Sequence, residues 1–365
     1  MTGRAAEPRK DMLDASEAWE LLRGIRSEAD AEAAGLLRTG EGDSDMDSDS
    51  DSDSDSDVDV DAHRRQRKWK WKWTSGNISP EADVLLDRYL PLCLAGPHVA
   101  FAQLGQSLDG FIATRTGDAD YVTGEEDRAH LHRLRALADA VVVGAGTAVA
   151  DDPQLTVRAC SGANPVRVVL DLHGRVPLRH GVFTDGSAPT LWVVGAGHEN
   201  GRAVPDGVDV LSLPDSDAFA PRSLLRTLAR RGLGRVLIEG GGITVSRFLH
   251  ERALHRLYVT VAPVLLGDGI PGIRFAGPEL MRDALRPRVR RSALGEDTLF
   301  DLDLDLDLDL GIDLDLGIDP GLAADSGSGL RTTPSGEPLA DEHTDTGQAR
   351  GEGEHSVHHG DGQSQ

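Results

Sequence analysis

Between residues 97 and 306, short apolar runs alternate along the chain with polar segments of helical periodicity. Seven of these runs have the length of a strand. They cover residues 98–104, 140–146, 166–171, 190–194, 235–239, 256–263 and 297–304. The second run is apolar until it reaches its glycines, and it predicts a buried strand.

Two polar segments, 125–140 and 221–232, predict helices between these strands. Leucines recur at helical spacing in the first, where Thr123 and Glu126 also fit a capping box. The second has proline near its first turn and glycine at its end. Strands that alternate with helices predict an α/β fold in which helices flank a mostly parallel central sheet.

The composition divides the chain into segments. Residues 11–38 are rich in helix formers, whereas aspartate occupies every odd position of 43–61, where charge repulsion and the lack of anything to bury predict disorder. Alternating Leu and Asp begin inside the last predicted strand, and only the first few of them can belong to a sheet. We therefore expect an N-terminal helical segment (1–40), a disordered acidic Ser-Asp tract with a Lys/Trp patch (41–76), a linker helix (77–96), an α/β domain (97–306) and a disordered low-complexity tail (307–365).

The net charge of −23 comes mainly from these repeats. Ten aspartates in 43–61 and eight in 301–319 account for all but five of the excess negative charges, so the acidity indicates little about a partner. Cys93 and Cys160 lack the spacing of a disulfide framework or a metal site, and we expect no metal. The chain has no apolar run long enough to span a membrane and no signal-peptide core, so we expect a cytoplasmic protein.

Residues 64–73 end by alternating lysine with tryptophan. One interpretation is a nucleic-acid or membrane-surface contact, because cations meet phosphates and tryptophan stacks or inserts. We favour the other, a low-complexity segment that pairs loosely with the adjacent acidic tract, because no binding domain surrounds the patch.

Two glycine-containing turns are the first candidates for a binding site. Residues 141–147 and 237–244 each contain a strand, then glycines, then a turn or helix. Ligands of open α/β sheets bind beyond the carboxyl ends of strands, and glycine lets backbone N–H groups approach a phosphate. Neither turn matches a Rossmann or P-loop motif, so each alone is more simply a tight connection. Two such turns in one sheet favour a dinucleotide.

Single polar residues give weaker signals. Asp109 lies in a turn after the first strand, where a bond to its own backbone is the alternative to chemistry. Arg158 suits a phosphate at the mouth of the sheet, and an exposed surface arginine is the alternative. His130 and His132 lie on different faces of a predicted helix, which is wrong for a joint metal ligand.

Four segments, in this order, resemble the pyrimidine reductases of riboflavin synthesis: "AQLGQSLDGFIA", "YVTGEEDRAHLHRLRALADAVVVGAGTAVADDPQLTVR", "PVRVVLDLHGR" and "VLIEGGGITVSRFL…VAPVLLG". The resemblance covers residues 97–306 and implies a dihydrofolate-reductase-like fold. It implies NADPH as hydride donor and a 5-amino-6-(5-phosphoribosylamino)uracil-type substrate, reduced at the ribose C1′ to a ribityl chain. It also implies a homodimer.

The resemblance places residues on two sides of a site. On the substrate side it places Ala119, Arg135, Leu155, Arg158 and Glu239. On the cofactor side it places Gly105, Tyr121, Thr147, Asp151, Leu172, Gly241, Gly242, Ile243, Thr244, Val245, Ser246 and Arg247.

Two positions depart from the family pattern. Gln103 stands where many members have lysine, and an amide supplies neither a charge nor an acid. Ala119 stands where the family often has serine. Asp109, Asp151 and Glu239 remain as acid candidates, and we take Glu239 and Asp109 as the catalytic pair.

The resemblance extends to the reductase half of bifunctional proteins whose other half is a zinc deaminase. The chain has no P-C-x-x-C motif, and its first 96 residues are few and low in complexity. We expect a reductase alone. The alternatives are a reductase of the same fold with another substrate and an inactive nucleotide-binding or scaffold protein.

Overall fold

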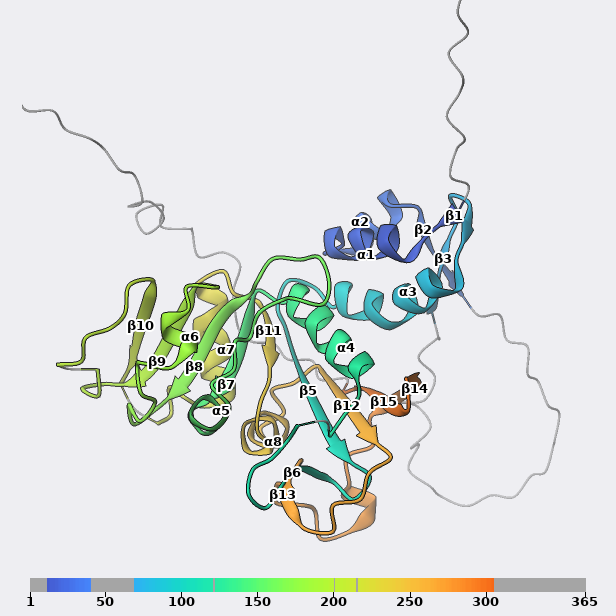
Figure 1. Ribbon diagram of the computed structural model, residues 1–365. Coiled ribbons are helices and arrows are strands. Elements are labelled where there is room, and N and C mark those ends of the chain that lie inside the picture. Colours follow the sequence, from blue (N-terminus) through green and yellow to red (C-terminus); the bar gives the residue numbers. More distant parts are fainter. Residues whose placement is uncertain (1–11, 41–68, 121, 200, 215, 305–365) are drawn as a thin grey trace, which may run out of the picture. The chain divides into compact units, whose positions relative to one another are not determined.

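The computed structural model describes residues 12–40, 69–120, 122–199, 201–214 and 216–304. Its largest element is a nine-stranded sheet (Figure 1). The strands of this sheet are β5 (Val99–Ser107), β7 (Ala140–Gly144), β8 (Val166–Asp171), β9 (Thr190–Gly195), β10 (Val208–Leu213), β11 (Arg235–Ile238), β12 (Arg256–Ala262), β14 (Arg288–Leu294) and β15 (Asp297–Asp303). Their order is β10-β9-β8-β7-β11-β5-β12-β15-β14. All pairs from β10 to β12 are parallel and β15 is antiparallel to both of its neighbours, so the α/β fold with a mostly parallel sheet is confirmed.

Helices lie on both faces of this sheet. They are α4 (Glu125–Ala136), α5 (Ala145–Asp151), α6 (Gly181–Thr184), α7 (Pro221–Arg230) and α8 (Gly242–His250). Alternate residues of each strand enter different cores: Phe101 of β5 packs in the core with α4, and Ala102 packs in the core with α7 and α8. Strands covered on both faces read as continuous apolar runs, which is why the pattern identified them.

Four strands of the α/β domain were not predicted from the sequence, and one helix cap was predicted wrongly. The edge strands β10 and β14 carry polar or charged residues at about every second position; β10 is mostly half-buried and β14 is mostly exposed. The short strands β6 (Phe111–Thr114) and β13 (Gly269–Pro271) pair with each other, and a 3₁₀ turn, η2, covers Met281–Asp283. The predicted capping box was wrong, because α4 begins after Gly124 without a side-chain cap and Thr123 bonds Asp127 instead.

The described residues before 97 are more varied than the predicted helical segment and linker. They form β1 (Met12–Leu13), α1 (Ala15–Gly24), α2 (Glu28–Ala33), β2 (Leu36–Gly40), β3 (Trp69–Trp73), β4 (Asn77–Ile78) and α3 (Pro80–Cys93). Thus 36–40 is a strand, not helix, and the end of the Lys/Trp patch is a strand paired with it, not a disordered tract. The remaining residues of the acidic tract and the patch, and the tail from 305, lie outside the described residues.

Buried polar contacts tie α1 and α3 to the α/β domain. The guanidinium of Arg235, at the start of β11, donates to the carbonyls of Leu92 (2.9 Å) and Gly96 (3.0 Å) at the end of α3, and to that of Leu137 (3.1 Å) after α4. Trp19 of α1 is buried and donates from its indole to the Ser161 carbonyl at 2.8 Å. The segment predicted as a linker helix is therefore part of the core.

Within the described ranges, no helix combines the length and the apolar character that crossing a bilayer requires.

Candidate active site

The two glycine-containing turns meet at the carboxyl ends of the adjacent parallel strands β7 and β11. Gly241 donates its backbone N–H to the hydroxyl of Thr147, on α5, at 2.8 Å. The Thr244 side chain of α8 occupies the space that a side chain on Gly144 would need, so the two turns are also packed together at this point. The strand register thus brings together residues almost one hundred positions apart, as the sequence analysis expected of two turns in one sheet.

The start of α8 is closely packed backbone. A Cβ at Gly242 would collide with the Gly272 carbonyl, which explains glycine there. The first N–H groups of a helix have no intrahelical acceptor and favour an anion. A pocket of about 290 Å³ adjoins this end of α8, and Arg247 and Arg274 bring positive charge to its lining.

A buried ion pair joins α4 to the turn after β11. Nε and Nη2 of Arg135 donate to the two carboxylate oxygens of Glu239 at 2.8 and 2.7 Å, and Nη1 donates to the Thr156 carbonyl at 3.0 Å. The two side chains are 8% and 6% exposed. All three donating nitrogens of Arg135 are therefore engaged within the protein, and both oxygens of Glu239 are occupied as acceptors.

The loop 152–158 is held in an unusual backbone conformation. Asp152 and Leu155 have φ of 39° and 54°, and the Leu155 side chain is buried. Strain of this kind persists where the surroundings impose it. The Asp152 carboxylate accepts the N–H groups of Gly181 and Val182 at the start of α6, at 2.9 and 3.3 Å.

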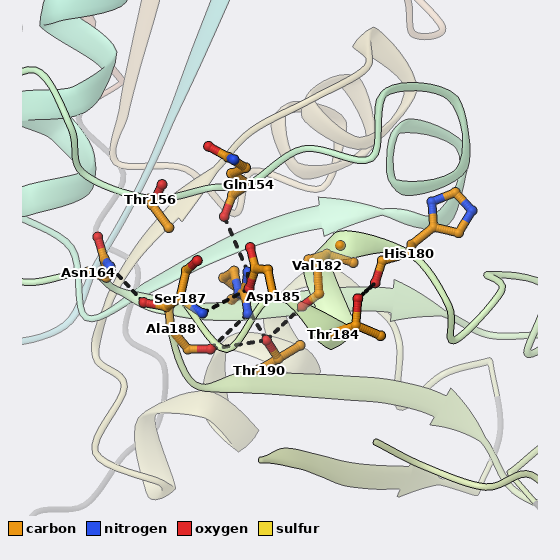
Figure 2. Close-up of polar contacts among 12 residues, drawn as sticks. Gln154, Thr156, Asn164, His180, Val182, Thr184, Asp185, Ser187, Ala188 and Thr190 are labelled. Carbon is orange, nitrogen blue, oxygen red and sulfur yellow. Dashed lines mark hydrogen bonds and ion pairs between the residues drawn. The ribbon is translucent and has the colours of Figure 1, made fainter. Parts of the chain in front are cut away.

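The buried guanidinium of Arg167, on β8, gives this loop further support. It donates to the Gln154 carbonyl (3.5 Å), Asp185 Oδ1 (2.7 Å), the Ala188 carbonyl (2.8 Å) and Thr190 Oγ1 (2.9 Å). Figure 2 shows Gln154, Asp185, Ala188 and Thr190 around the point where these bonds meet. Arg167 was not among the predicted site residues, because the sequence of a strand does not show which groups a buried arginine contacts.

Arg158 is exposed at the end of the loop and folds back on it. Its Nη1 donates to Gln154 Oε1 (2.5 Å) and Thr156 Oγ1 (2.6 Å), and its backbone N–H donates to His132 Nδ1 at 3.1 Å. His132 is therefore the tautomer with its proton on Nε2. Burial, and then the charges of Arg135 and Arg158, lower the pKa of His132, so it is neutral at physiological pH. The contact between His132 and Arg158 was not predicted, because His132 was considered only as a possible metal ligand.

Gln103 points into the α4 side of the sheet beside Glu239. Ile238 of β11 pairs with Ala102 of β5, so the residues that follow them, Glu239 and Gln103, lie side by side. Gln103 is buried, and its Nε2 donates to both carboxylate oxygens of Asp127 at 3.1 and 3.2 Å. Asp127 is also buried and was not identified from the sequence, where it was one of several acids in a helix.

Asp109 fastens a loop. It accepts the Ser107 hydroxyl (2.6 Å) and the N–H groups of Gly267 (2.7 Å) and Leu266 (3.1 Å). The Ser107 bond, followed by the Gly267 bond, lowers the pKa of the Asp109 carboxyl. A carboxyl with a lowered pKa is ionised at neutral pH and has no proton to donate, so the structure disfavours the predicted proton-donor role.

The other predicted residues are dispersed around this edge of the sheet. Ala119 and Asp151 are exposed, Leu172 is half-buried just after β8, and Val245 and Ser246 are buried in α8, where the Ser246 hydroxyl accepts the Arg274 N–H at 2.7 Å. Ile243 is 87% exposed. Tyr121 lies outside the described residues. Among all residues that the structure describes, no three or more His, Cys, Asp or Glu side chains form a cluster that could hold a metal.

Comparison with known proteins identifies the family of the α/β domain. A family model described as the RibD C-terminal domain matches residues 98–298. The riboflavin biosynthesis protein RibD of Aquifex aeolicus is 35% identical over 195 residues, which are 53% of this chain and 54% of the relative. The 2,5-diamino-6-ribosylamino-4(3H)-pyrimidinone 5′-phosphate reductase of Methanothermobacter thermautotrophicus is 36% identical over 207 residues, which are 53% of this chain and 93% of the relative.

A solved structure of RibD from Acinetobacter baumannii is similar in three dimensions, with 29% identity and a TM-score of 0.50, over 62% of this chain and 64% of that chain. The chain spans about half the length of the RibD sequences that it matches in Aquifex aeolicus and Bacillus amyloliquefaciens.

Proposed function

Because the chain belongs to the RibD C-terminal domain family, we propose that it is an NADPH-dependent reductase of riboflavin biosynthesis. It reduces the ribosyl group of 5-amino-6-(5-phosphoribosylamino)uracil to ribityl by hydride transfer to C1′. The name of the archaeal relative gives a ribosylamino-pyrimidinone 5′-phosphate as its substrate. That compound and the uracil substrate share the phosphorylated ribosylamino group, so either fits the same reduction.

The observation that carries the proposal is the union of the two turns through Thr147 and Gly241. It supports a cofactor site because backbone N–H groups at the start of α8 lie at the carboxyl edge of a parallel sheet, where dinucleotide phosphates bind. Gly242, which leaves no room for a side chain, and the arginines of the adjacent pocket fit a phosphorylated cofactor. When bound, NADPH supplies the hydride.

The substrate side is formed by loop 152–158 and the buried ion pair. Arg158 is exposed, and its Nη1 anchors it to the loop. Within the described part of the chain, Nε and Nη2 of Arg158 make no hydrogen bond, which leaves them for a phosphate. The ion pair between Arg135 and Glu239 holds α4 against the turn after β11 and so fixes the position of α4 relative to that turn. The task of these residues is to align C1′ with the nicotinamide, since correct orientation supplies much of the acceleration of such a transfer.

The test is turnover of enzymatically prepared substrate by the purified chain. NADPH consumption is followed by absorbance, and mass spectrometry checks that the product has gained two hydrogens. Turnover of the aminouracil substrate is compared with turnover of the diamino-pyrimidinone substrate. The same measurements are made on an Arg158→Ala variant, for which we expect a higher KM because the proposed phosphate contact is lost. Consumption of NADPH without the ribityl product, or no consumption with either substrate, would refute the proposal.

NADPH binding and growth complementation separate the alternative functions. NADPH binding without turnover of either pyrimidine supports a scaffold protein, and growth of a riboflavin-requiring strain that lacks only its reductase supports the pathway assignment. We further propose a cytoplasmic homodimer, on the basis of the resemblance. Light scattering of the purified chain at working concentration tests the homodimer, and a monomeric mass would exclude it.

A further inference from the structure

A buried carboxyl group with four hydrogen-bond contacts lies in the first turn of α4. Asp127 Oδ1 accepts the Thr260 hydroxyl at 2.6 Å and Oδ2 accepts the Thr123 hydroxyl at 2.7 Å. Gln103 Nε2 completes the set by donating to both oxygens. These donors come from β12, the segment before α4, and β5, so the carboxyl lies where three parts of the fold meet.

No cation forms an ion pair with Asp127 among the residues that the structure describes. β5 and β12 face it with the neutral Gln103 and Thr260, and β15 faces it with a second buried carboxylate, Asp297. On α4 itself the charged neighbours are two first-turn glutamates and Arg128, which donates to the Thr123 carbonyl at 3.3 Å. Burial raises the pKa of Asp127 and the negative charge of Asp297 adds to the rise, while the hydrogen bonds from Thr260, Thr123 and Gln103 oppose it; the net direction is upward. Asp127 therefore retains a proton at higher pH than an ordinary aspartate.

Thr123 connects this carboxyl to the proposed site. Thr123 is half-buried, whereas Asp127 is buried. The methyl group of Thr123 occupies the space that a side chain on Gly105 would need, because a Cβ built on Gly105 would lie only 2.8 Å from Thr123 Cγ2. Gly105 is one of the residues that the resemblance places on the cofactor side, so Thr123 lies beside the expected cofactor position. A hydroxyl accepts one proton while it donates another, which makes it suited to relay.

The other candidate acids are occupied. Both oxygens of Glu239 accept from the guanidinium of Arg135, which is a cation, whereas the side-chain donors to Asp127 are neutral. Asp109 is committed as an acceptor to the loop at 266–267. The amide of Gln103 donates hydrogen bonds but is not an acid, so it cannot protonate the substrate.

We propose that Asp127 and Thr123 form a two-residue proton relay that supplies the proton consumed in the reduction. This inference rests on the proposed function. Hydride adds to C1′ of the ring-opened imine, and the electron pair of the C=N bond moves to nitrogen. When Asp127 carries a proton on Oδ2, it donates this proton to Thr123 Oγ1, so the 2.7 Å hydrogen bond between these atoms reverses and the Thr123 hydrogen can point to the substrate. The nitrogen takes the proton of the Thr123 hydroxyl, and Thr123 takes the proton of the Asp127 carboxyl. Asp127 is left as a carboxylate and is reprotonated from water after the product leaves.

The test compares Thr123→Val with Thr123→Ser, and Asp127→Asn with Thr260→Val. Single-turnover rates are measured across pH, together with the NADPH dissociation constant and the melting temperature of each variant. General acid catalysis contributes about 100- to 10,000-fold, so we expect Thr123→Val and Asp127→Asn to slow the reductive step at least about 100-fold. Thr123→Ser is expected to restore the rate to within about fivefold of wild type, an order-of-magnitude allowance for a less fixed hydroxyl.

The pH profile separates a relay from a merely structural cluster. The protonated carboxyl is the active form, so the wild-type rate falls as pH rises through the pKa of Asp127, and Asp127→Asn removes this alkaline limb. Thr260→Val removes a donor that favours the carboxylate, and the limb therefore moves to higher pH. A structural role instead predicts that all four variants lose melting temperature and rate together, with the limb unmoved.

Three results would overturn the relay: a wild-type rate in Thr123→Val, an alkaline limb that survives in Asp127→Asn, or Thr123→Ser as slow as Thr123→Val. If Asp127→Asn does not fold, the Thr123 pair decides. These outcomes presuppose wild-type turnover. Its absence would refute the proposed function, whereas normal wild-type turnover with unaffected variants would refute the relay alone.

Discussion

The change Glu239→Gln tests the ion pair that closes the site. Arg135 donates to both Glu239 oxygens at 2.8 and 2.7 Å, and both side chains are less than one tenth exposed. Glutamine keeps one acceptor and turns the other oxygen into an N–H₂ group that faces a guanidinium. Removing one partner of a buried pair costs about 3–5 kcal/mol because the other charge stays uncompensated. Since one hydrogen bond survives, we expect a loss of about 3 kcal/mol in the free energy of unfolding.

The double change Arg135→Met with Glu239→Leu supplies the contrast. Replacing a buried pair by apolar side chains of similar volume is often neutral or stabilising, so we expect the double variant within about 1 kcal/mol of wild type. Urea unfolding of wild type, Glu239→Gln, Arg135→Met, Glu239→Leu and the double variant gives the five free energies. The reasoning fails if Glu239→Gln stays within about 0.5 kcal/mol of wild type, or if the double variant is no more stable than the single ones. A folded double variant that no longer reduces substrate would also support the proposed placing of the pair in the site.

Three further predictions follow from single contacts. Thr147→Val leaves the Gly241 N–H without its acceptor, which costs about 1–3 kcal/mol, so titration should show NADPH affinity about tenfold weaker, with Thr147→Ser near wild type. Gly242→Ala drives a methyl group into the Gly272 carbonyl, and we expect both a lower melting temperature and weaker NADPH binding; an unchanged melting temperature would contradict the close approach. Burial lowers the pKa of His130 from 6.5 to about 3, so the unfolded chain binds the extra proton between these values and stability is lost as pH falls through that window. His130→Asn should remove up to about 1.4 kcal/mol per pH unit of that slope in urea midpoints, and an identical slope in the variant would show that His130 is not its source.

Strand prediction succeeded where most side chains are buried. Residues 166–171, for example, are apolar except for Arg167 and Asp171, and they form β8 with the predicted bounds. The edge strand β14 failed because its sequence, RVRRSAL, is mostly exposed and offers no apolar run. The N-terminal segment was misjudged for a related reason. Its composition favours helix, whereas the pairing of 36–40 with 69–73 depends on a partner 33 residues away.

The predicted site shows the same division. Glycine-containing turns at the ends of two apolar runs indicated a shared edge of a parallel sheet, because such strands have their carboxyl ends on one side. The expected role of Asp109 depended on what surrounded it, and its surroundings made it a poor proton donor. The role of Asp127 was invisible, because its hydrogen-bond partners Gln103 and Thr260 are 24 and 133 residues away.

The sequence by itself therefore determined the layers of the α/β domain and the edge of the sheet where chemistry is expected. These follow from local periodicity, which records how much of each segment is buried. Only the tertiary structure decided which polar groups are partners: Arg135 with Glu239, and Gln103 with Asp127. Pairing of this kind depends on strand order and register, which bring distant residues within the few ångströms over which hydrogen bonds and buried charges act.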